Sequence, residues 1–408
     1  MSTSVERAHG AGQAGTARTA RGGRGLVARR VGLLAVAGVL MVIGTGEIRE
    51  LRAYRETVVA SKALTAQVKL STYFSGIAGT LMDAPVYVFD SGVPGGSVLL
   101  LGGAHPYEPA SPVMAYLVME NIEVTRGRVF VIPRANMSAA TLGMLGNAYP
   151  AFFRIKTPWG EKKYRIGDRE TNPLEQWPDP FTFVHYPSTQ NLAYQDSRNL
   201  NRTFPGRPDG NLTERTSFAI SELIRREKID LTIDVHEASL GYPVVSTYVC
   251  HQRAEELCMM AAMMLSAEQF PMKTETSPKT LRGLTHREIG DFTDSFAALM
   301  ETPEPFIEKF AGPMTEELML TGRDEFVQTA ATRGLLYTEY DIKTGASLDY
   351  RVGRHLAGAA ELIKQMGEFY PAKALRATWP TYADVMQHGI GYFLHDPAAA
   401  DQRRVFLN

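Results

Sequence analysis

An uncharged run of sixteen residues near the N-terminus divides this chain into two parts with different properties. The run occupies residues 31–46 (VGLLAVAGVLMVIGTG) and is flanked by Arg30 and Glu47. As a helix it would span about 24 Å at ~1.5 Å per residue, slightly less than the ~30 Å hydrocarbon core of a bilayer. The run is longer than the apolar core of a typical signal peptide but slightly shorter than a full membrane span. We therefore interpret it as a membrane anchor, with a cleaved signal segment or a buried core helix as alternatives.

The charges on either side of the run predict how it is oriented in a membrane. Residues 1–30 carry six arginines, one acid and many small residues, so we expect a disordered basic arm. After the run, Glu47, Glu50 and Glu56 cancel Arg49, Arg52 and Arg55, and we expect residues 47–67 to form a polar helical stalk. By the positive-inside rule the arm stays in the cytoplasm and everything after residue 46 lies on the extracytoplasmic side. Because Ile43–Gly46 is a poor A-x-A site, an uncleaved anchor is favoured over secretion after signal cleavage.

The composition of the whole chain is that of a globular protein. Hydrophobic residues make up 44% and charged residues 21% of the 408 residues, and the net charge of −1 gives no reason to expect a nucleic-acid partner. Two cysteines, Cys250 and Cys258, are too few for a disulfide framework or a cysteine-rich zinc module. A single disulfide between them stays possible. Any metal site must therefore use histidines and carboxylates.

From about residue 68, short apolar runs alternate with helical patterns. Strands and helices in alternation predict an α/β domain over residues 68–370, with a mixed, mostly parallel twisted sheet and helices on both faces. Residues 140–195 interrupt the alternation with prolines, aromatics and charges, so we interpret them as an insertion beside the site; residues 371–408 are expected to form a C-terminal tail. We expect strands over 97–101, 128–132, 229–235, 244–250 and 296–300, and helices over 112–122 and 213–228.

Two segments at predicted strand ends carry metal-binding side chains. His105 and Glu108 follow the strand 97–101, at the edge where open α/β sheets place ligands. His236 ends the strand 229–235, with Asp234 on the same face. Two histidines and one glutamate form the ligand set of catalytic zinc in peptidases. Each segment alone is also compatible with a hydrogen-bonded histidine at a sheet edge.

Two further segments carry groups that could bind or react. Asn201 and Arg202 are adjacent hydrogen-bond donors, and an arginine can hold a carboxylate through two parallel N–H bonds. Glu301 ends an apolar strand before a proline turn, so we expect partial dehydration to raise the pKa of its carboxyl group, as suits a general base. The plain alternatives are a polar turn before a helix and a solvated glutamate.

Together the four segments resemble the zinc carboxypeptidase-like superfamily. The order is H-x-x-E, then N-R before an aromatic residue, then a histidine on a strand, then a glutamate ending a strand. The runs NLNRTFPG and DVH are most similar to the succinylglutamate desuccinylase/aspartoacylase branch, and the similarity covers roughly residues 68–370. The resemblance implies one Zn²⁺ per chain held by His105, Glu108 and His236. It also implies that Arg202, helped by Asn201, binds a substrate carboxylate and that Glu301 is the general base.

The sequence departs from the family pattern at two places. Asn199 stands where the family usually has an aspartate that orients the first zinc histidine, and a neutral amide raises the basicity of that ligand less. The arginine that supports the oxyanion usually lies shortly before the N-R pair, and the insertion blurs its position. Arg154, Arg165, Arg169 and Arg198 are all candidates for that role.

The resemblance implies zinc-dependent hydrolysis of an amide bond in a carboxylate-bearing substrate, such as an N-acyl amino acid. Export gives some weight to peptide or cell-envelope substrates. A metallocarboxypeptidase acting on peptides or cell-wall fragments is one alternative, and a non-catalytic binding protein on the same fold is another. A serine hydrolase is disfavoured because the sequence has no G-x-S-x-G motif.

Overall fold

In the computed structural model the chain forms two compact units, residues 1–54 and residues 55–408. The first unit contains one long helix, and the second contains every strand and all the candidate site residues. The structure describes residues 17–143, 150–242, 244–307, 312–335 and 345–408.

The first unit contains helix α1 (Ala17–Ala53), which includes the whole uncharged run. Within the described chain it is the one helix long and apolar enough to cross a membrane, and its apolar window is exposed rather than buried. The helix begins inside the predicted disordered arm, because alanine and arginine have high helix propensity and can extend a helix from the apolar run. Residues 1–16 of that arm lie outside the described residues. At its other end the helix stops at Ala53, short of the predicted end of the stalk at residue 67.

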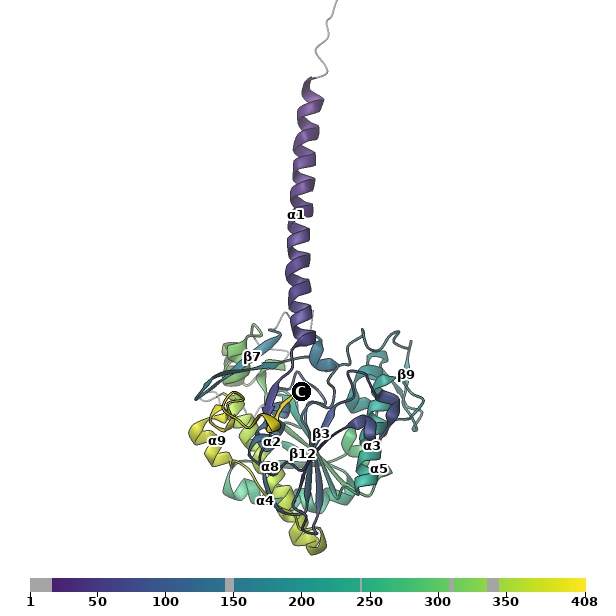
Figure 1. The fold of residues 1–408 in the computed structure, drawn as a ribbon, viewed down its shortest axis with the longest axis vertical. Coiled ribbons are helices and arrows are strands. Elements are labelled where there is room, and N and C mark those ends of the chain that lie inside the picture. The colour runs from purple at the N-terminus through teal and green to yellow at the C-terminus, as the bar shows by residue number, and fades with distance from the viewer. Residues whose placement is uncertain (1–16, 144–149, 243, 308–311, 336–344) are drawn as a thin grey trace, which may run out of the picture. The chain divides into compact units, whose positions relative to one another are not determined.

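The second unit is built on an eight-stranded sheet with the order β13-β12-β14-β11-β4-β6-β3-β2 (Figure 1). The four central strands, β14, β11, β4 and β6, run parallel to one another, and antiparallel pairs occur towards both edges. The sheet is thus mixed with a parallel centre, as predicted. Its strands are β2 (Ala66–Lys69), β3 (Pro85–Asp90), β4 (Ser97–Leu101), β6 (Arg128–Ile132), β11 (Leu231–Ser239), β12 (Thr247–Cys250), β13 (Lys273–Thr276) and β14 (Phe296–Glu304).

Helices cover both faces of this sheet (Figure 1). Strand β4 shows why, since Val98 and Leu100 pack in one apolar core while Leu99 and Leu101 pack in the other. Side chains alternate along a strand, so a strand that is apolar at every position must be buried on both sides. The first core contains α2 (Ala110–Asn121), α4 (Glu255–Glu268) and α8 (Leu348–Phe369), and the second contains α3 (Leu212–Glu227) and part of α5 (Thr285–Phe292).

Local sequence signals account for several element boundaries. Strands β4 and β6 have the bounds that their apolar runs predict. Helix α3 begins with a capping box, in which Asn211 accepts from the backbone of Glu214 and the Glu214 side chain accepts from the backbone of Asn211. The two cysteines are free, buried thiols, so the possible disulfide is not formed.

The predicted insertion lies outside the large sheet. Two small antiparallel pairs, β7 with β8 and β9 with β10, occupy its described part. Residues 144–149 lie outside the described residues. The strands of the insertion are β7 (Phe152–Thr157), β8 (Gly160–Arg165), β9 (Phe183–Val184) and β10 (Asn191–Leu192).

Three further helices follow later in the chain: α6 (Glu316–Thr321), α7 (Glu325–Thr332) and α9 (Tyr382–His388).

The second unit extends beyond both predicted limits of the domain, residues 68 and 370. Strand β1 (Thr57–Val59) pairs with β16 (Val405–Leu407), and β15 (Arg376–Thr378) pairs with β5 (Glu123–Arg126). The predicted tail and the end of the predicted stalk are therefore part of the fold. These strands of three or four residues are too short to show a periodic apolar pattern, so their pairing could not be predicted.

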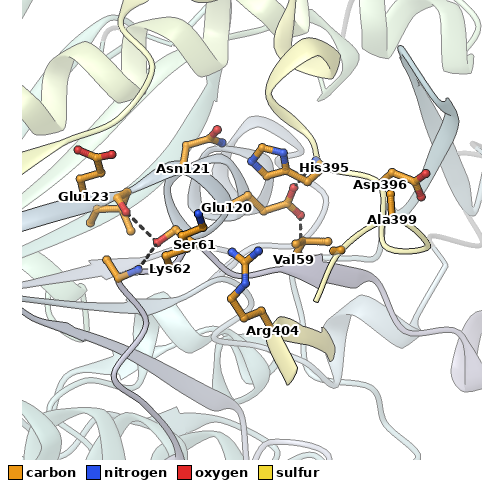
Figure 2. A pocket seen from close by; sticks show the side chains of 13 residues that line it. Val59, Ser61, Lys62, Glu120, Asn121, Glu123, His395, Asp396, Ala399 and Arg404 are labelled. Atoms are coloured by element: carbon orange, nitrogen blue, oxygen red, sulfur yellow. Dashed lines mark hydrogen bonds between the residues drawn. The ribbon is translucent and has the colours of Figure 1, made fainter. Parts of the chain in front are cut away.

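A surface cavity of about 510 Å³ lies where β1, the end of α2 and the C-terminal segment meet (Figure 2). The Glu120 carboxylate beside it accepts from the backbone N–H groups of Val59 (3.2 Å) and His395 (2.8 Å) and pairs with Lys162 (2.5 Å). Glu120 thus ties three distant segments together, and this cavity is separate from the predicted metal ligands.

Candidate metal centre

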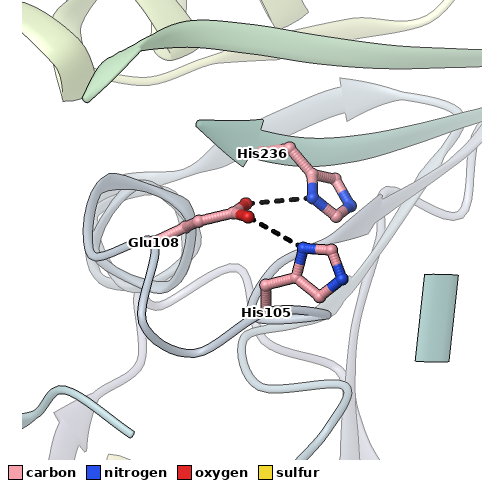
Figure 3. A group of neighbouring side chains, drawn as sticks. All are labelled: His105, Glu108 and His236. Carbon is pink, nitrogen blue, oxygen red and sulfur yellow. Dashed lines mark hydrogen bonds and ion pairs between the residues drawn. The ribbon is translucent and has the colours of Figure 1, made fainter. Parts of the chain in front are cut away.

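The three predicted metal ligands converge at the carboxyl ends of β4 and β11 (Figure 3). His105 and Glu108 lie on the loop between β4 and α2, and His236 is the sixth residue of β11. Glu108 lies between the histidines, with 2.8 Å from its Oε1 to His105 Nδ1 and 2.9 Å from its Oε2 to His236 Nδ1. One possible ligand atom from each residue lies within 4.8 Å of the others, and all three residues are buried. The triad is therefore consistent with one metal ion.

The remaining ring nitrogen of each histidine faces a polar side chain. His105 Nε2 donates to Asn199 Oδ1 at 2.8 Å, and the same oxygen accepts from the backbone N–H of Asn201, which identifies it as the amide oxygen. His236 Nε2 lies 2.9 Å from Asp234 Oδ2. Asn199 thus occupies the orienting position beside the first histidine, where the family usually has aspartate, and Asp234 orients the second.

The protonation state of His105 indicates whether the triad could bind a cation. Burial lowers the pKa of His105 to about 4, so its ring is neutral at pH 7 and carries one N–H. Because Nε2 uses that proton toward Asn199, the Nδ1 lone pair points at the Glu108 carboxylate. Two electron-rich groups aimed at each other at 2.8 Å are the arrangement that a shared divalent cation stabilises.

Glu108 and His236, the other two candidate ligands, each shift the pKa of the other. Burial opposes the charged form of Glu108, but His105 and His236 outweigh it and hold the pKa of Glu108 below its ordinary range. Burial likewise opposes charge on His236, yet the carboxylates of Asp234 and Glu108 raise its pKa well above the usual value. In this state a protonated His236 supplies the positive charge that the acidic groups require.

Glu301 is the register partner of His236 across the parallel pair of β14 and β11. Burial, followed by the nearby carboxylates of Glu108, Asp234 and Glu237, raises the pKa of Glu301 well above its ordinary value. The pKa direction is the one expected from its place at the end of an apolar strand. Its Oε2 has no hydrogen-bond partner in the described structure, so this oxygen is available to a substrate or water.

Asn201 and Arg202 lie on the short helical turn at 200–202, which contacts the start of α5 through Asn201. Asn201 Oδ1 accepts from the backbone N–H of Thr285 at 2.8 Å, so the amide oxygen already has a structural partner. Arg202 donates to the backbone oxygen of Asn201 at 2.7 Å, and its nearest carboxylate, that of Asp196, is 4.0 Å away. Burial and the charge of Arg169 lower the pKa of Arg202 to about 10, which leaves the guanidinium charged at pH 7.

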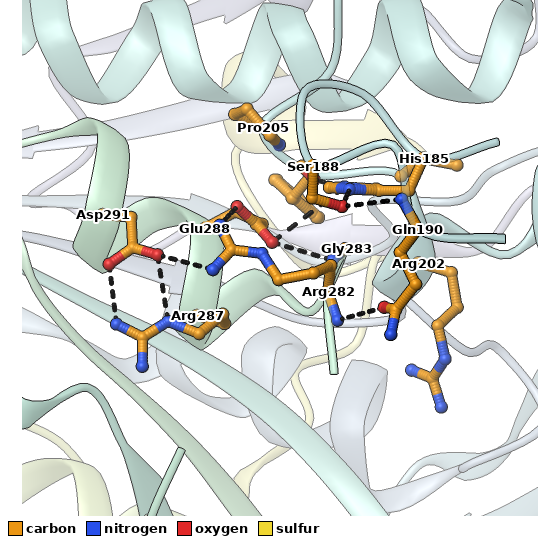
Figure 4. Close-up of polar contacts among 12 residues, drawn as sticks. His185, Ser188, Gln190, Arg202, Pro205, Arg282, Gly283, Arg287, Glu288 and Asp291 are labelled. Atoms are coloured by element: carbon orange, nitrogen blue, oxygen red, sulfur yellow. Dashed lines mark hydrogen bonds and ion pairs between the residues drawn. The ribbon is translucent and has the colours of Figure 1, made fainter. Parts of the chain in front are cut away.

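A dense polar network surrounds the start of α5 (Figure 4). Glu288 accepts from the backbone N–H of Gly283 at 2.8 Å and from Arg282 at 2.7 Å. Arg287 pairs with Asp291 at 2.7 Å. These contacts hold residues 282–283, just before α5, in place. The backbone of Arg202 lies next to Gly283.

The structure separates the four candidate arginines for oxyanion support. Arg165 is paired with Glu56 inside the fold, and Arg154 pairs with Glu316 at the surface. Arg198 pairs with Asp179 at 2.9 Å. These three guanidinium groups therefore have structural partners.

The fourth candidate, Arg169, lies in the field of the metal ligands. Its charge acts on His105; burial opposes the charged form of Arg169, but Glu108 and neighbouring acidic groups outweigh it and raise the pKa of Arg169. Within the described residues its buried Nε has no hydrogen-bond partner. Among the four candidates, Arg169 is thus the one whose charge acts on a predicted metal ligand.

A buried ionic cluster behind the centre had no sequence signal. Arg351 on α8 pairs with Glu237, at 3.0 Å, and with Glu304. Glu237 also accepts from the backbone N–H of Ala110 at 2.6 Å, and its own N–H donates to Glu108 at 3.0 Å. Burial raises the pKa of Glu237 to about 7 against the opposing charge of Arg351. The cluster couples α8 and β14 to the loop that carries Glu108.

Two more buried histidines flank the site. The Nδ1 atom of His286 has no partner in the described structure, and His355 Nε2 lies 3.1 Å from the hydroxyl of Thr302, next to Glu301. Burial lowers the pKa of each histidine to about 3, so both rings are neutral.

Comparison with known proteins gives one family match. Residues 180–297 match the model of the succinylglutamate desuccinylase/aspartoacylase catalytic domain. This segment contains Asn201, Arg202 and His236, whereas His105, Glu108 and Glu301 lie outside it. No curated protein matches the chain.

Several solved structures resemble the chain at low similarity. A succinylglutamate desuccinylase from Silicibacter sp. TM1040 is 17% identical, with 53% of each chain covered and a TM-score of 0.33, so the chain spans about half of that protein. A succinylglutamate desuccinylase/aspartoacylase from Rhodobacter sphaeroides is 18% identical, with 70% of this chain and 59% of that chain covered and a TM-score of 0.37. A metallo-carboxypeptidase from Burkholderia cenocepacia is 12% identical, with coverage of 74% and 65% and a TM-score of 0.41. These similarities are too low for a function to be transferred.

The family match itself agrees with the motifs. It covers the N-R pair and the histidine of β11, and the geometry adds the remaining ligands from outside the matched segment. The family consists of zinc-dependent hydrolases. Residues 180–297 therefore match the succinylglutamate desuccinylase/aspartoacylase catalytic domain, the resemblance that the sequence motifs predicted.

Proposed function

We propose that this protein is a zinc-dependent hydrolase that cleaves an amide bond in a carboxylate-bearing substrate, with N-acyl amino acids as the first candidates. The observation that carries the proposal is the convergence of His105, Glu108 and His236, with the Nδ1 lone pair of a neutral His105 aimed at a carboxylate. Three protein ligands leave a coordination position open, which distinguishes catalytic from structural zinc sites.

When bound, Zn²⁺ supplies Lewis acidity and lowers the pKa of a coordinated water toward ~7. Asn199 and Asp234 hold the two imidazole rings so that both Nδ1 atoms face the ion. Glu301, with its raised pKa and an unpartnered Oε2, accepts a proton from the attacking water. It then returns this proton to the leaving nitrogen, since a carboxyl group whose pKa is raised holds a proton more readily than an ordinary one.

Two guanidinium groups give the site its preference for anionic substrates. Arg202 binds the substrate carboxylate, helped by the amide NH₂ group of Asn201, whose oxygen is already used by Thr285. Arg169 stabilises the negative charge that develops on the scissile carbonyl oxygen, since its buried Nε lacks a partner in the described structure. An uncompensated buried donor favours a substrate that supplies an acceptor.

We further propose that α1 anchors the enzyme, with the second unit on the extracytoplasmic side. Its length supports this, because 29 residues from Gly25 to Ala53 span about 43 Å at ~1.5 Å per residue, enough to cross a bilayer. The arginine-rich sequence before it favours a cytoplasmic N-terminus.

A substrate panel tests this proposal. The zinc-loaded full chain is assayed with N-acyl amino acids, with their carboxamide analogues, and with peptides whose C-termini are free or amidated. We expect hydrolysis of N-acyl amino acids with a free carboxylate and none in the Glu301→Gln variant. Release of C-terminal amino acids from free peptides alone would instead identify a carboxypeptidase. A zinc-loaded chain that hydrolyses no substrate in the panel would contradict the proposed activity.

A further inference from the structure

The candidate ligand Glu108 accepts a hydrogen bond from a residue outside the triad. The backbone N–H of Glu237 donates to Glu108 Oε2 at 3.0 Å. The same oxygen lies 2.9 Å from His236 Nδ1, so one carboxylate oxygen meets both a histidine ring and a backbone donor (Figure 3). The place of the Glu237 backbone therefore helps to set the direction in which the Glu108 carboxylate points.

The side chain of Glu237 holds the same loop from the other face of the sheet. Side chains alternate along β11, so Glu237 points away from His236 and toward the first core, which contains α8. Its Oε2 accepts from the backbone N–H of Ala110 at 2.6 Å. Ala110 begins α2 and lies two positions after Glu108. Glu237 thus holds Glu108 in two ways, through its own backbone and through its carboxylate.

Arg351 on α8 orients the Glu237 carboxylate for this contact. Its guanidinium donates to Glu237 Oε1 at 3.0 Å, which leaves Oε2 for Ala110. Arg351 also pairs with Glu304 and donates to the backbone oxygen of Met319. Arg351 and both glutamates are buried. Without the guanidinium, two buried carboxylates would be left without a cation, which is a strongly unfavourable arrangement.

The loop has a second attachment to β11 that does not involve Arg351. The Ser111 hydroxyl donates to the backbone oxygen of Val235 at 2.5 Å and accepts from the backbone N–H of Gly103 at 2.8 Å. Loss of the Arg351 contact should therefore shift the Glu108 carboxylate without releasing the loop from the strand. An effect on the metal centre can then be measured in a folded protein.

We propose that Arg351 is a positioning residue for the metal centre and acts on Glu108 through Glu237. This inference rests on the proposed zinc site and adds to it a residue that forms no hydrogen bond to any of the three ligands in the described structure. Groups that hold a metal ligand in one orientation contribute to affinity, and their removal typically lowers it about 10- to 100-fold. The arginine reaches the centre from α8, on the face of the sheet opposite His236.

The metal affinity of the full chain tests this role. Zinc is titrated in competition with a chromogenic chelator, and the visible absorption of the Co²⁺-loaded protein reports on the arrangement of ligands around the ion. We expect Arg351→Met to lower zinc affinity about 10- to 100-fold and to change the Co²⁺ spectrum. An Arg351→Met protein with the affinity and spectrum of the wild type would overturn the inference.

Glu304→Gln is the matched control. Glu304 pairs with the same guanidinium, but within the described residues it forms no hydrogen bond to Ala110 or Glu108. The variant keeps the contact between Arg351 and Glu237, so its zinc affinity and Co²⁺ spectrum should remain those of the wild type. An equal loss of affinity in Glu304→Gln and Arg351→Met would assign the cluster a general structural role and overturn the inference.

A double variant tests the route through Glu237. Glu237→Gln should also weaken zinc binding, because it replaces one carboxylate oxygen by an NH₂ group that can accept from neither Arg351 nor Ala110. If Arg351 acts through Glu237, adding Arg351→Met should cause little further loss, whereas losses that multiply would refute this route. Should Arg351→Met fail to fold, wild-type zinc affinity in Glu237→Gln would overturn the inference by itself.

The wild-type protein separates this inference from the proposed function. A wild-type chain that binds no zinc would contradict the proposed function and, with it, the role of Arg351. A wild-type chain that binds zinc and hydrolyses substrate, together with an Arg351→Met chain of unchanged zinc affinity, would leave the function in place and refute the positioning role alone.

Discussion

His236 on β11 and Glu301 on β14 are direct register partners in two neighbouring parallel strands. Partners in such a pair point to the same face of the sheet and lie about 4.8 Å apart along the hydrogen-bonding direction. The hydrogen-bonded pairing of β11 with β14 therefore places Glu301 beside His236, one of the candidate metal ligands. This relationship explains how a carboxylate 65 positions further along the chain meets the metal ligands.

Removing one ligand should remove the metal. We expect His236→Ala to reduce bound zinc from about one equivalent to a small fraction, because two remaining ligands hold Zn²⁺ far less tightly than three. Metal analysis after dialysis measures this. His388→Ala, which removes an exposed histidine, should keep the full equivalent. A His236→Ala protein that also retains full zinc would contradict the site.

Glu301→Gln should separate metal binding from turnover. The variant should keep its zinc and lose about 10²- to 10⁴-fold in kcat, the range typical of a lost general base. Steady-state kinetics on the best substrate of the panel, together with metal analysis, provide the measurement. Glu275→Gln, at an exposed position on β13, is the matched control. Unchanged kcat in Glu301→Gln would assign the proton transfers to another group.

Arg202→Ala should weaken recognition of the substrate carboxylate. A charge-assisted hydrogen bond contributes about 1.5–3 kcal/mol, so kcat/KM for the carboxylate substrate should fall about 10- to 100-fold. Activity on a carboxamide analogue should change little, which makes the ratio of the two the decisive measurement. Arg403→Ala removes an exposed guanidinium and should leave the ratio unchanged. If both substrates lose activity equally in Arg202→Ala, its role is structural.

Asn199 offers a variant expected to improve metal binding. Asn199→Asp should increase zinc affinity, because a carboxylate raises the basicity of His105 more than an amide does, and Asn199→Ala should lower it about 10- to 100-fold. Competition with a chromogenic chelator measures both. An identical affinity in all three proteins would mean that the contact with His105 does not tune the metal.

Glu56→Gln should destabilise the second unit at neutral pH. Although burial opposes its charge, Arg134 and Arg165 lower the pKa of Glu56 from 4.5 to about 2, which corresponds to about 3 kcal/mol of unfolding free energy. A lowered folded-state pKa stabilises above pH 4.5, and this stabilisation is lost as the pH falls toward 2. The difference in Tm between wild type and Glu56→Gln should therefore be largest near pH 7 and shrink below pH 4.5. Glu123→Gln, at an exposed position, is the control, and a pH-independent difference would contradict the assignment.

The sequence predicted those parts of the fold that local patterns determine. The buried runs of β4 and β6 match their strands because a parallel central strand must be apolar at nearly every position. Strands β11 and β14 continue past their apolar runs through His236 and Glu301, since the parallel ladder between them supplies backbone partners regardless of side chain. The apolar pattern therefore ended before the strands did.

The parts that could not be predicted depend on partners distant in sequence. Four arginines before the N-R pair looked alike in the sequence, and only the structure shows that Arg154, Arg165 and Arg198 form ion pairs with Glu316, Glu56 and Asp179. The cluster of Glu237, Arg351 and Glu304 joins three elements and has no local signature. Short strands such as β1 and β16 are specified by their mutual pairing, which a one-dimensional pattern does not encode.

The pairing of β1 with β16 also limits where proteolysis could separate the second unit from α1. A cut that leaves the second unit intact must fall ahead of Glu56, because Thr57–Val59 are held in the ladder with Val405–Leu407 and Glu56 is buried against two arginines. Cleavage even a few residues later would free the ladder from one side and leave Arg134 and Arg165 without their carboxylate. The released second unit would then be less stable than one that keeps residues 56–59.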